Sequence, residues 1–270
     1  MDAALTVLNA GVRLSIHPRS GGKISEVFAV SLGRNLLAEP SPEAVLALEN
    51  GRQFSVSGWD EAFPTLEPCG AIPTLGYAWR TPADCALHDH QLITQWEFDD
   101  WRLARTIRLE PMGLAVSYVI TNQADTPRPA LWAGHVLMTM NEFQQAQLPA
   151  GEIFPGPGLH LESLKEILLD TDQGWVIPHS PDRGRSWKFF LPNRQPVTLC
   201  YSDARVVLTS EAPWWGIWLN LGALHTRCIG VEPTTFPTDC LRKVNPPFGP
   251  GESVSTSWRL AIQPVSNSCK

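Results

Sequence analysis

The chain is built from short segments in which apolar and polar residues alternate, and glycine or proline separates one segment from the next. The alternation is clear at 12–16 and at 254–262. A period of two puts every second side chain on one face, so each segment is predicted to be a strand with one buried face. The 20 glycines and 24 prolines suit many turns between short strands. The sequence therefore predicts an all-β fold, a large antiparallel β-sandwich.

Other segments agree with this fold class. Two runs, 102–109 and 114–120, flank the turn signal Glu110-Pro111-Met112-Gly113 and predict a β-hairpin. Further strands are predicted at 129–140, 186–191, 197–201, 205–210, 216–221 and 227–232. Short helices are predicted at 41–49, from a start signal, and at 161–168, from apolar spacings of three and four. Neither helix could build a helical core.

Composition limits the domain count and the class of partner. No low-complexity linker divides the 270 residues, so we expect a single domain over 1–270. Hydrophobic residues make up 43% and charged residues 18%, enough apolar material for a large core. A net charge of -6 without a basic run disfavours nucleic acid and anionic membrane as partners and favours a small molecule. The oligomeric state is not indicated.

The expected location of the protein and the oxidation state of its cysteines can also be inferred from the sequence. The N-terminus lacks a basic region followed by an apolar stretch, and no window approaches about 18 apolar residues. We therefore expect a soluble, cytoplasmic protein. The six cysteines show no Cys-x-x-Cys spacing and are expected to be reduced packing residues.

Two apolar runs each carry one titratable residue. His135 lies inside 131–138, and Glu232 follows 228–231 and precedes Pro233. Because proline cannot donate to a sheet ladder, we expect the strand to end at Glu232 and its carboxylate to lie where a cleft begins. An imidazole and a carboxylate can act as an acid and base pair. Taken singly, each residue also has a structural interpretation, a core histidine or a turn cap.

These runs and other short motifs resemble the aldose 1-epimerase (mutarotase) family. The run around His135 is similar to the strand of the family's general acid, and Glu232-Pro233-Thr234-Thr235 to the segment of its general base. Gly21–Ser25 is similar to an early glycine turn, Gly58–Thr65 to a loop of one branch, and Leu87–His90 to an Asp-His-Gly segment. The motifs follow the family order over roughly 10–262. Val136 and Gln91 depart from it, where the family commonly has proline and glycine.

The resemblance implies a galactose mutarotase-like supersandwich and an isomerase of carbohydrate metabolism. Such an enzyme interconverts the α and β anomers of an aldohexose or related sugar by acid and base ring opening, with Glu232 as base and His135 as acid. His90 would orient the sugar or donate a second hydrogen bond, and Asp60 or Glu61 would accept hydrogen bonds from its hydroxyls. No cofactor is required. The sequence does not decide which sugar binds, and a sugar phosphate is an alternative substrate.

Two further residue sets are candidates for the site. His88 and His90 would share one face of an extended segment, as in a metal site, but the nearest acid, Glu97, falls on the opposite face. No metal is therefore expected, and both histidines are assigned to sugar binding. Among the 11 tryptophans, a first group near the polar motifs could stack on a sugar ring: Trp59, Trp79, Trp96 and Trp101. A second group is expected in the core: Trp187, Trp218 and Trp258.

Two other classes of protein fit parts of the pattern. A non-catalytic carbohydrate-binding β-sandwich would keep the pocket without turnover. A glycan lyase or hydrolase would need a paired acid or a tyrosine base, and none of the three tyrosines lies beside the main motifs. The convergence of His135 and Glu232 in one pocket is the feature that separates the epimerase hypothesis from the others.

Overall fold

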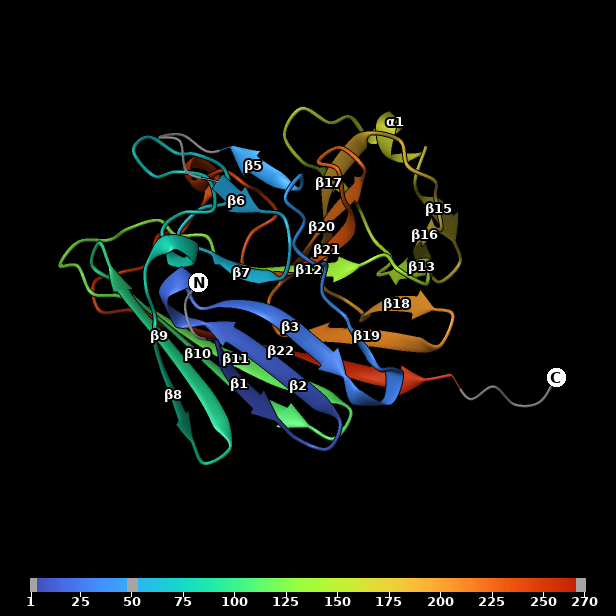
Figure 1. The fold of residues 1–270 in the computed structure, drawn as a ribbon. Helices are drawn as coiled ribbons and strands as arrows, with labels where there is room; N and C mark the ends of the chain where they lie inside the picture. The colour runs from blue at the N-terminus through green and yellow to red at the C-terminus, as the bar shows by residue number, and fades with distance from the viewer. Residues whose placement is uncertain (1–3, 48–52, 266–270) are drawn as a thin grey trace.

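The fold consists of two large antiparallel sheets packed face to face. We describe residues 4–47 and 53–265 of a computed structural model (Figure 1). In the first sheet the strands are ordered β1 (Leu5–Leu8), β2 (Val12–His17), β3 (Lys23–Ala29), β7 (Trp59–Ala62), β12 (Ala133–Thr139), β21 (Arg227–Thr234), β20 (Trp214–Leu221), β17 (Arg185–Pro192) and β14 (Phe154–Pro155), with β4 (Arg34–Asn35) beside β3. This order puts β12 and β21, which carry His135 and Glu232, side by side at the centre of the sheet.

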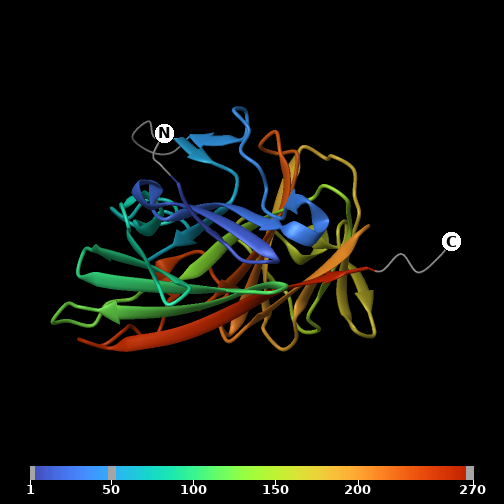
Figure 2. The same ribbon diagram turned by 60° about the horizontal axis from the view of Figure 1, so that its bottom comes forward.

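The second sheet covers the inner face of the first. Its order is β15 (Leu169–Thr171), β16 (Gly174–Pro178), β13 (Phe143–Leu148), β18 (Val197–Tyr201), β19 (Ala204–Ser210), β22 (Ser253–Pro264), β11 (Gly113–Asn122), β10 (Trp101–Glu110), β9 (Gln91–Phe98) and β8 (Asp84–His88). Figure 2 shows the blue N-terminal strands lying over the green and red strands of this sheet. A small hairpin, β5 (Val45–Ala47) and β6 (Gln53–Ser55), forms a separate two-stranded sheet. The predicted antiparallel β-sandwich is confirmed.

The space between the sheets is filled by aromatic side chains from both layers. Trp59 of β7 packs against Trp258 of β22 with ring centroids 4.8 Å apart. Trp96, Trp101 and Trp187 are also fully buried in the same core. Fully burying a large side chain contributes about 1.5–3 kcal/mol relative to leaving it exposed, so these rings stabilise the contact between the two layers. The prediction of core positions for Trp187 and Trp258 is confirmed.

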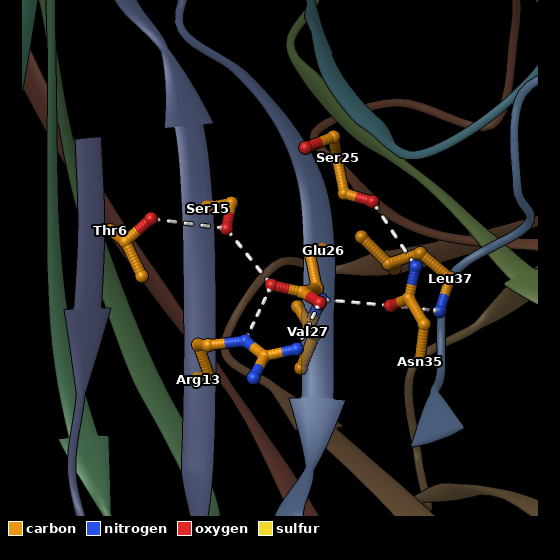
Figure 3. A network of polar contacts seen from close by, with 8 residues as sticks. All are labelled: Thr6, Arg13, Ser15, Ser25, Glu26, Val27, Asn35 and Leu37. Atoms are coloured by element: carbon orange, nitrogen blue, oxygen red, sulfur yellow. Dashed lines mark hydrogen bonds and ion pairs between the residues drawn. The ribbon is translucent and has the colours of Figure 1, made fainter. Parts of the chain in front are cut away.

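A polar network on the first sheet holds its N-terminal strands together (Figure 3). Arg13 of β2 donates two hydrogen bonds to Glu26 of β3, at 2.7 and 2.9 Å, and Ser15 donates a third at 2.9 Å. The Arg13 guanidinium lowers the pKa of the Glu26 carboxyl, so the pair remains charged at neutral pH. The Asn35 side chain accepts hydrogen bonds from the backbone of Val27 and Leu37, which fixes β4 against β3.

The helix and hairpin predictions have different outcomes. The hairpin is confirmed, because β10 pairs with β11 from Trp101 to Glu110 with Pro111 and Met112 in the turn. One short helix, α1 (Leu161–Leu164), confirms part of the helix predicted at 161–168. The helix predicted at 41–49 is wrong: its start signal forms a turn, and the segment then pairs as β5 with β6. The rest of that range lies outside the described residues.

Short 3-10 turns and the state of the cysteines complete the description of the fold. The 3-10 turns span Pro18–Ser20, Val30–Leu32, Ala78–Arg80 and Leu241–Lys243. The five cysteines within the described ranges are free, as expected, and Cys269 lies outside them. Among the described residues, no helix has the length and apolar character needed to cross a membrane.

Candidate functional site

Asp60, His135 and Glu232 form a row across three neighbouring strands of the first sheet. His135 of β12 is the direct partner of Asp60 in β7. The β12–β21 ladder aligns Ala133 with Thr234 and Leu137 with Gly230, so Glu232 stands opposite His135. Residues directly opposite on antiparallel strands project to the same face. The register therefore brings together the imidazole and the carboxylate that the sequence places almost a hundred positions apart.

His135 and Glu232 both line a cavity of about 260 Å³. This volume is close to the lower end of the range for small-molecule sites, about 300–1,000 Å³. Apolar side chains form part of its wall, among them Phe54, Leu66, Leu75 and Trp218. Lys188, Glu67 and Asp239 add charge to the wall. A concave site with a few convergent polar groups is suited to a small polar ligand.

The strand that carries Glu232 does not end there. β21 continues to Thr234, and Pro233 lies opposite Trp215 of β20. The expectation that proline would stop the strand is wrong, because Pro233 lacks only a donor on its β12 side, where the neighbouring residue is small. A Cβ on Gly134 would lie 3.4 Å from the Pro233 ring, an ordinary packing distance, so the proline fits within the sheet beside this strand.

Glu232 is completely buried, with 0% of its side chain exposed. Its Oε2 accepts a short hydrogen bond from the Lys188 ammonium of β17. Its Oε1 has no hydrogen-bond partner and lies 3.9 Å from His135 Nε2. Burial raises the pKa of the Glu232 carboxyl, and the Lys188 charge opposes that rise. One oxygen is thus anchored by a cation and the other is available as an acceptor beside His135.

Burial has the opposite effect on His135. Burial, and then the Lys188 charge, lower the pKa of the imidazole to about 3, while Asp60 acts in the other direction. The ring lies between Phe54 and Trp218, with centroid distances of 6.0 and 6.3 Å. These effects favour the neutral imidazole in the free protein at neutral pH.

The opposite shifts of the pair have a chemical consequence. The pKa of the His135 imidazole falls below the raised pKa of the Glu232 carboxyl, so over the interval between them the pair holds one proton. That proton can occupy either group, since their atoms are 3.9 Å apart. The two groups can exchange the roles of acid and base, as a reversible proton transfer requires.

The cavity contains charged residues that the sequence did not single out as functional. Burial raises the pKa of Asp239 to about 6, with the Glu232 charge adding to the shift. Burial, and then the Asp239 charge, raise the pKa of Glu67. Lys188 alternates with buried Trp187 and Phe189 in β17, and its charge within an otherwise apolar strand is the signal that could have found it.

Asp60 faces a different cavity from Glu232. Its carboxylate receives a hydrogen bond of 2.5 Å from Lys23 Nζ, which also donates to the Ser57 carbonyl at 2.6 Å. Asp60 lines a neighbouring cavity of about 340 Å³, with Trp79 and Arg80 in its wall. Phe54 contributes to both cavities. Gly58, at φ 68°, lets the chain pass close to β3 just before β7 begins. A Cβ at this position would lie 2.6 Å from the Ile24 carbonyl oxygen.

Glu61 and Trp59 project to the other face of β7, into the core. Both oxygens of Glu61 are occupied by protein donors: Arg105 at 2.8 Å, Tyr118 at 2.9 Å and Trp132 at 3.0 Å. Alternation along a strand explains the division, since Asp60 must point away from its two neighbours. The placement gives Glu61 and Trp59 a structural role between the sheets and leaves the cavity to other residues.

His88 and His90 lie at an exposed hairpin. His88 ends β8 and pairs with Gln91 of β9, and Asp89 and His90 form the turn at φ 47° and 62°. The side chain of His88 is 73% exposed. Neither histidine lines the cavity of His135 and Glu232. Across residues 4–47 and 53–265, no group of three or more His, Cys, Asp or Glu side chains could hold a metal ion.

The predicted positions of several tryptophans differ from those in the structure. Trp96 and Trp101 are buried between the sheets, so they are not available to a sugar. Trp79 is half-buried at the neighbouring cavity. Trp218, expected in the core, instead lines the cavity of Glu232. The error has a simple cause, because alternation separates the two faces of a strand without identifying which face is covered by the other sheet.

No protein-family model and no curated protein sequence matches this chain significantly. Solved structures do resemble it. The Slr1438 protein of Synechocystis superposes with a TM-score of 0.72 at 15% identity, covering 97% of this chain and 96% of its own. A galactose mutarotase-like protein from Lactobacillus casei gives 0.72 at 16% identity, covering 97% and 100%.

A galactose mutarotase related enzyme from Lactobacillus acidophilus gives a TM-score of 0.70 at 13% identity, covering 99% of this chain and 100% of its own. Likenesses at these identities establish the architecture of the chain, and they extend over nearly its whole length. Together with the two packed antiparallel sheets, they confirm that this chain has the galactose mutarotase-like fold.

Proposed function

We propose that the protein is an aldose 1-epimerase that interconverts the anomers of an aldohexose or a related sugar. The observation that carries the proposal is the meeting of His135 and Glu232, 3.9 Å apart, in one cavity on the central strands. The fold of the solved mutarotase-like proteins supports the same class of reaction. Acid and base catalysis of this kind needs two groups that can each hold a proton.

The reaction proceeds by opening and closing the sugar ring. Glu232 Oε1, which has no protein partner, takes the proton of the C1 hydroxyl. His135 Nε2 delivers a proton to the ring oxygen, and the bond between C1 and the ring oxygen breaks to give the open-chain aldehyde. Rotation about the bond from C1 to C2 presents the other face of the aldehyde. Closure returns both protons and forms the other anomer.

The form of the site that starts this cycle has the proton on His135 and the charge on Glu232. Because burial raises the pKa of Glu232 and lowers that of His135, this form is a minor member of the singly protonated pair. Proton transfer between the two groups generates it without a change in the total number of protons. No nucleophile is needed, since no covalent bond to the protein forms.

The direct test is polarimetry of freshly dissolved α-anomers of glucose and galactose at low temperature, with glucose 6-phosphate as a charged comparison. We expect the purified protein to speed the approach to anomeric equilibrium for at least one of them. Sugar binding without acceleration of any substrate would instead identify a carbohydrate-binding protein that keeps the pocket but does not turn over.

His135→Asn is expected to reduce the rate constant for mutarotation by about 10²–10⁴, because it removes the proton donor to the ring oxygen while keeping a short polar side chain. Thermal unfolding measured on the same preparation separates a catalytic role of His135 from a packing role. His90→Asn, in the exposed turn, is the matched control and should behave as the unchanged protein. A His135→Asn protein with a lower Tm and full activity would contradict the acid role.

We also expect activity to survive exhaustive chelation. The reason is that the two proposed proton carriers can complete the cycle by themselves, and neither needs a Lewis acid to reach the required protonation state. Rates before and after treatment with EDTA, followed by addition of zinc or manganese, provide the measurement. Loss on chelation with recovery on one of these ions would require a different mechanism.

A further inference from the structure

Lys188 reaches Glu232 across an intervening strand. β17 pairs with β20, and β20 pairs with β21, so two ladders separate the lysine from the glutamate. The contact nevertheless forms, and the side chain of Lys188 is only 16% exposed. A long side chain held in buried contacts, here with Glu232 and over the Phe190 ring, loses much of its conformational freedom. Its position at the proposed base therefore requires a physical explanation.

Gly216 of β20 provides the space for this contact. It stands opposite Glu232 on one side and opposite Phe190 on the other. A Cβ at this position would lie 3.3 Å from Glu232 Oε2 and 3.4 Å from Lys188 Nζ. The backbone here is not in the left-handed region, so glycine is not required for conformation. The missing side chain instead leaves the gap through which the ammonium and the carboxylate meet.

The charges around Glu232 make this contact important for its protonation state. The titratable groups that face it are His135 from β12, Lys188 from β17, Asp239 and Glu67 from loops, and Cys228 on its own strand. Asp239 and Glu67 carry the same sign of charge as Glu232. Among the described groups in this cavity wall, Lys188 is the cation in contact with the carboxylate.

We propose that Lys188 is the positioning residue of the base: it anchors Glu232 Oε2, favours the charged form of the carboxylate and leaves Oε1 directed at the sugar. The inference rests on the proposed epimerase function for its catalytic meaning, although the effect of Lys188 on Glu232 exists without it. Burial favours a neutral Glu232, and a neutral carboxyl cannot accept the C1 hydroxyl proton.

The first test compares the pH dependence of kcat/KM in the unchanged protein and in Lys188→Met, which keeps the length of the side chain and removes its charge. Loss of an opposite charge at this distance should raise the pKa of Glu232 by about 1–3 units. Because the active form holds one proton on the pair, this moves the alkaline limb upward, and it lowers the maximal kcat/KM because the form with charged Glu232 becomes rarer. Lys188→Arg should return the alkaline limb toward its original position. Lys165→Met, at an exposed surface pair, is the matched control.

A structural role alone would give another result. It would lower the Tm of Lys188→Met and leave the alkaline limb of the folded fraction where it was, which would overturn the proposal. If Lys188→Met does not fold, Gly216→Ala serves instead, since it crowds the contact by a few tenths of an ångström without removing a charge. We expect it to move the alkaline limb in the same direction by a smaller amount, and an unmoved limb with full activity would contradict the proposal.

A second measurement does not depend on activity. The Glu232 carboxyl carbon can be titrated by NMR in protein labelled at glutamate, with Glu232→Gln identifying its signal. Lys188→Met, or Gly216→Ala in its place, should shift that titration to higher pH. If the unchanged protein does not catalyse mutarotation and this shift is still seen, the epimerase proposal fails while the role of Lys188 stands. An unshifted titration removes the role of Lys188 whatever the activity.

Discussion

Glu232→Gln is expected to lower the rate constant for mutarotation by about 10²–10⁴ and to change sugar affinity by less than about tenfold. Glutamine keeps the shape of the side chain and one acceptor oxygen, but it cannot take the C1 hydroxyl proton. Since Glu232 is fully buried and bonded to Lys188, the substitution also leaves that ammonium without an opposite charge beside it. Rates by polarimetry and affinities by calorimetry, on the same preparation, separate catalysis from binding.

Glu67→Gln provides the control for this experiment. Glu67 belongs to the same cavity wall and its pKa is also raised by burial, but it does not contact His135 in the structure. We expect it to retain most of the rate constant. The double variant Glu232→Gln with His135→Asn should be little worse than either single variant, because the two groups act as a unit. Multiplicative losses would show that they act independently.

Arg105→Met is expected to lower the free energy of unfolding by about 3–5 kcal/mol, because it leaves the Glu61 carboxylate buried without its counter-ion. The guanidinium is fully buried, donates to Glu61 at 2.8 Å and to the Gly22 carbonyl at 2.7 Å, and lies over the rings of Trp59 and Trp96. A loss of this size corresponds to a fall in Tm of roughly 6–20 °C for a domain of this length.

Arg102→Met tests whether the effect belongs to burial. Arg102 lies on the same strand, its side chain is 47% exposed, and its nearest acid, Glu97, is 3.9 Å away. An exposed pair of this kind contributes about 0–1 kcal/mol, so the Tm should scarcely change. Arg105→Met combined with Glu61→Gln should recover part of the lost stability. Equal Tm values for Arg102→Met and Arg105→Met would show that the core pair contributes nothing particular.

Local patterns in the sequence were sufficient for the architecture, and they singled out His135 and Glu232, which the structure brings together. Alternation predicts the strands, and the segments around His135 and Glu232 are each apolar enough to mark a central strand. Their meeting across β12 and β21 required the order of strands in the sheet, which the sequence supplied only through the resemblance of its motifs. The same reasoning could not identify Lys188, because its contact with Glu232 depends on Gly216 in a third strand.

The residues assigned to sugar binding show a second limit of sequence patterns. Trp59, Asp60 and Glu61 are consecutive, and alternation requires the middle one to face away from the other two. Which face meets the second sheet is decided by packing over the whole layer. His88 and His90 show a third limit, since a two-residue turn at Asp89 and His90 ends the extended segment before it can reach the site.

The central position of β12 and β21 separates the two proposed proton carriers from the parts of the cavity wall that would select a substrate. His135 and Glu232 are held by strands whose spacing of about 4.7–4.9 Å is set by the backbone ladder. Other parts of the cavity wall, such as Leu66, Leu75, Pro157 and Leu224, come from connecting segments. If the protein is the proposed epimerase, changes in those loops would alter which sugar is accepted while His135 and Glu232 keep their geometry. Its substrate preference would then diverge through mutation of the loops without loss of the proposed chemistry.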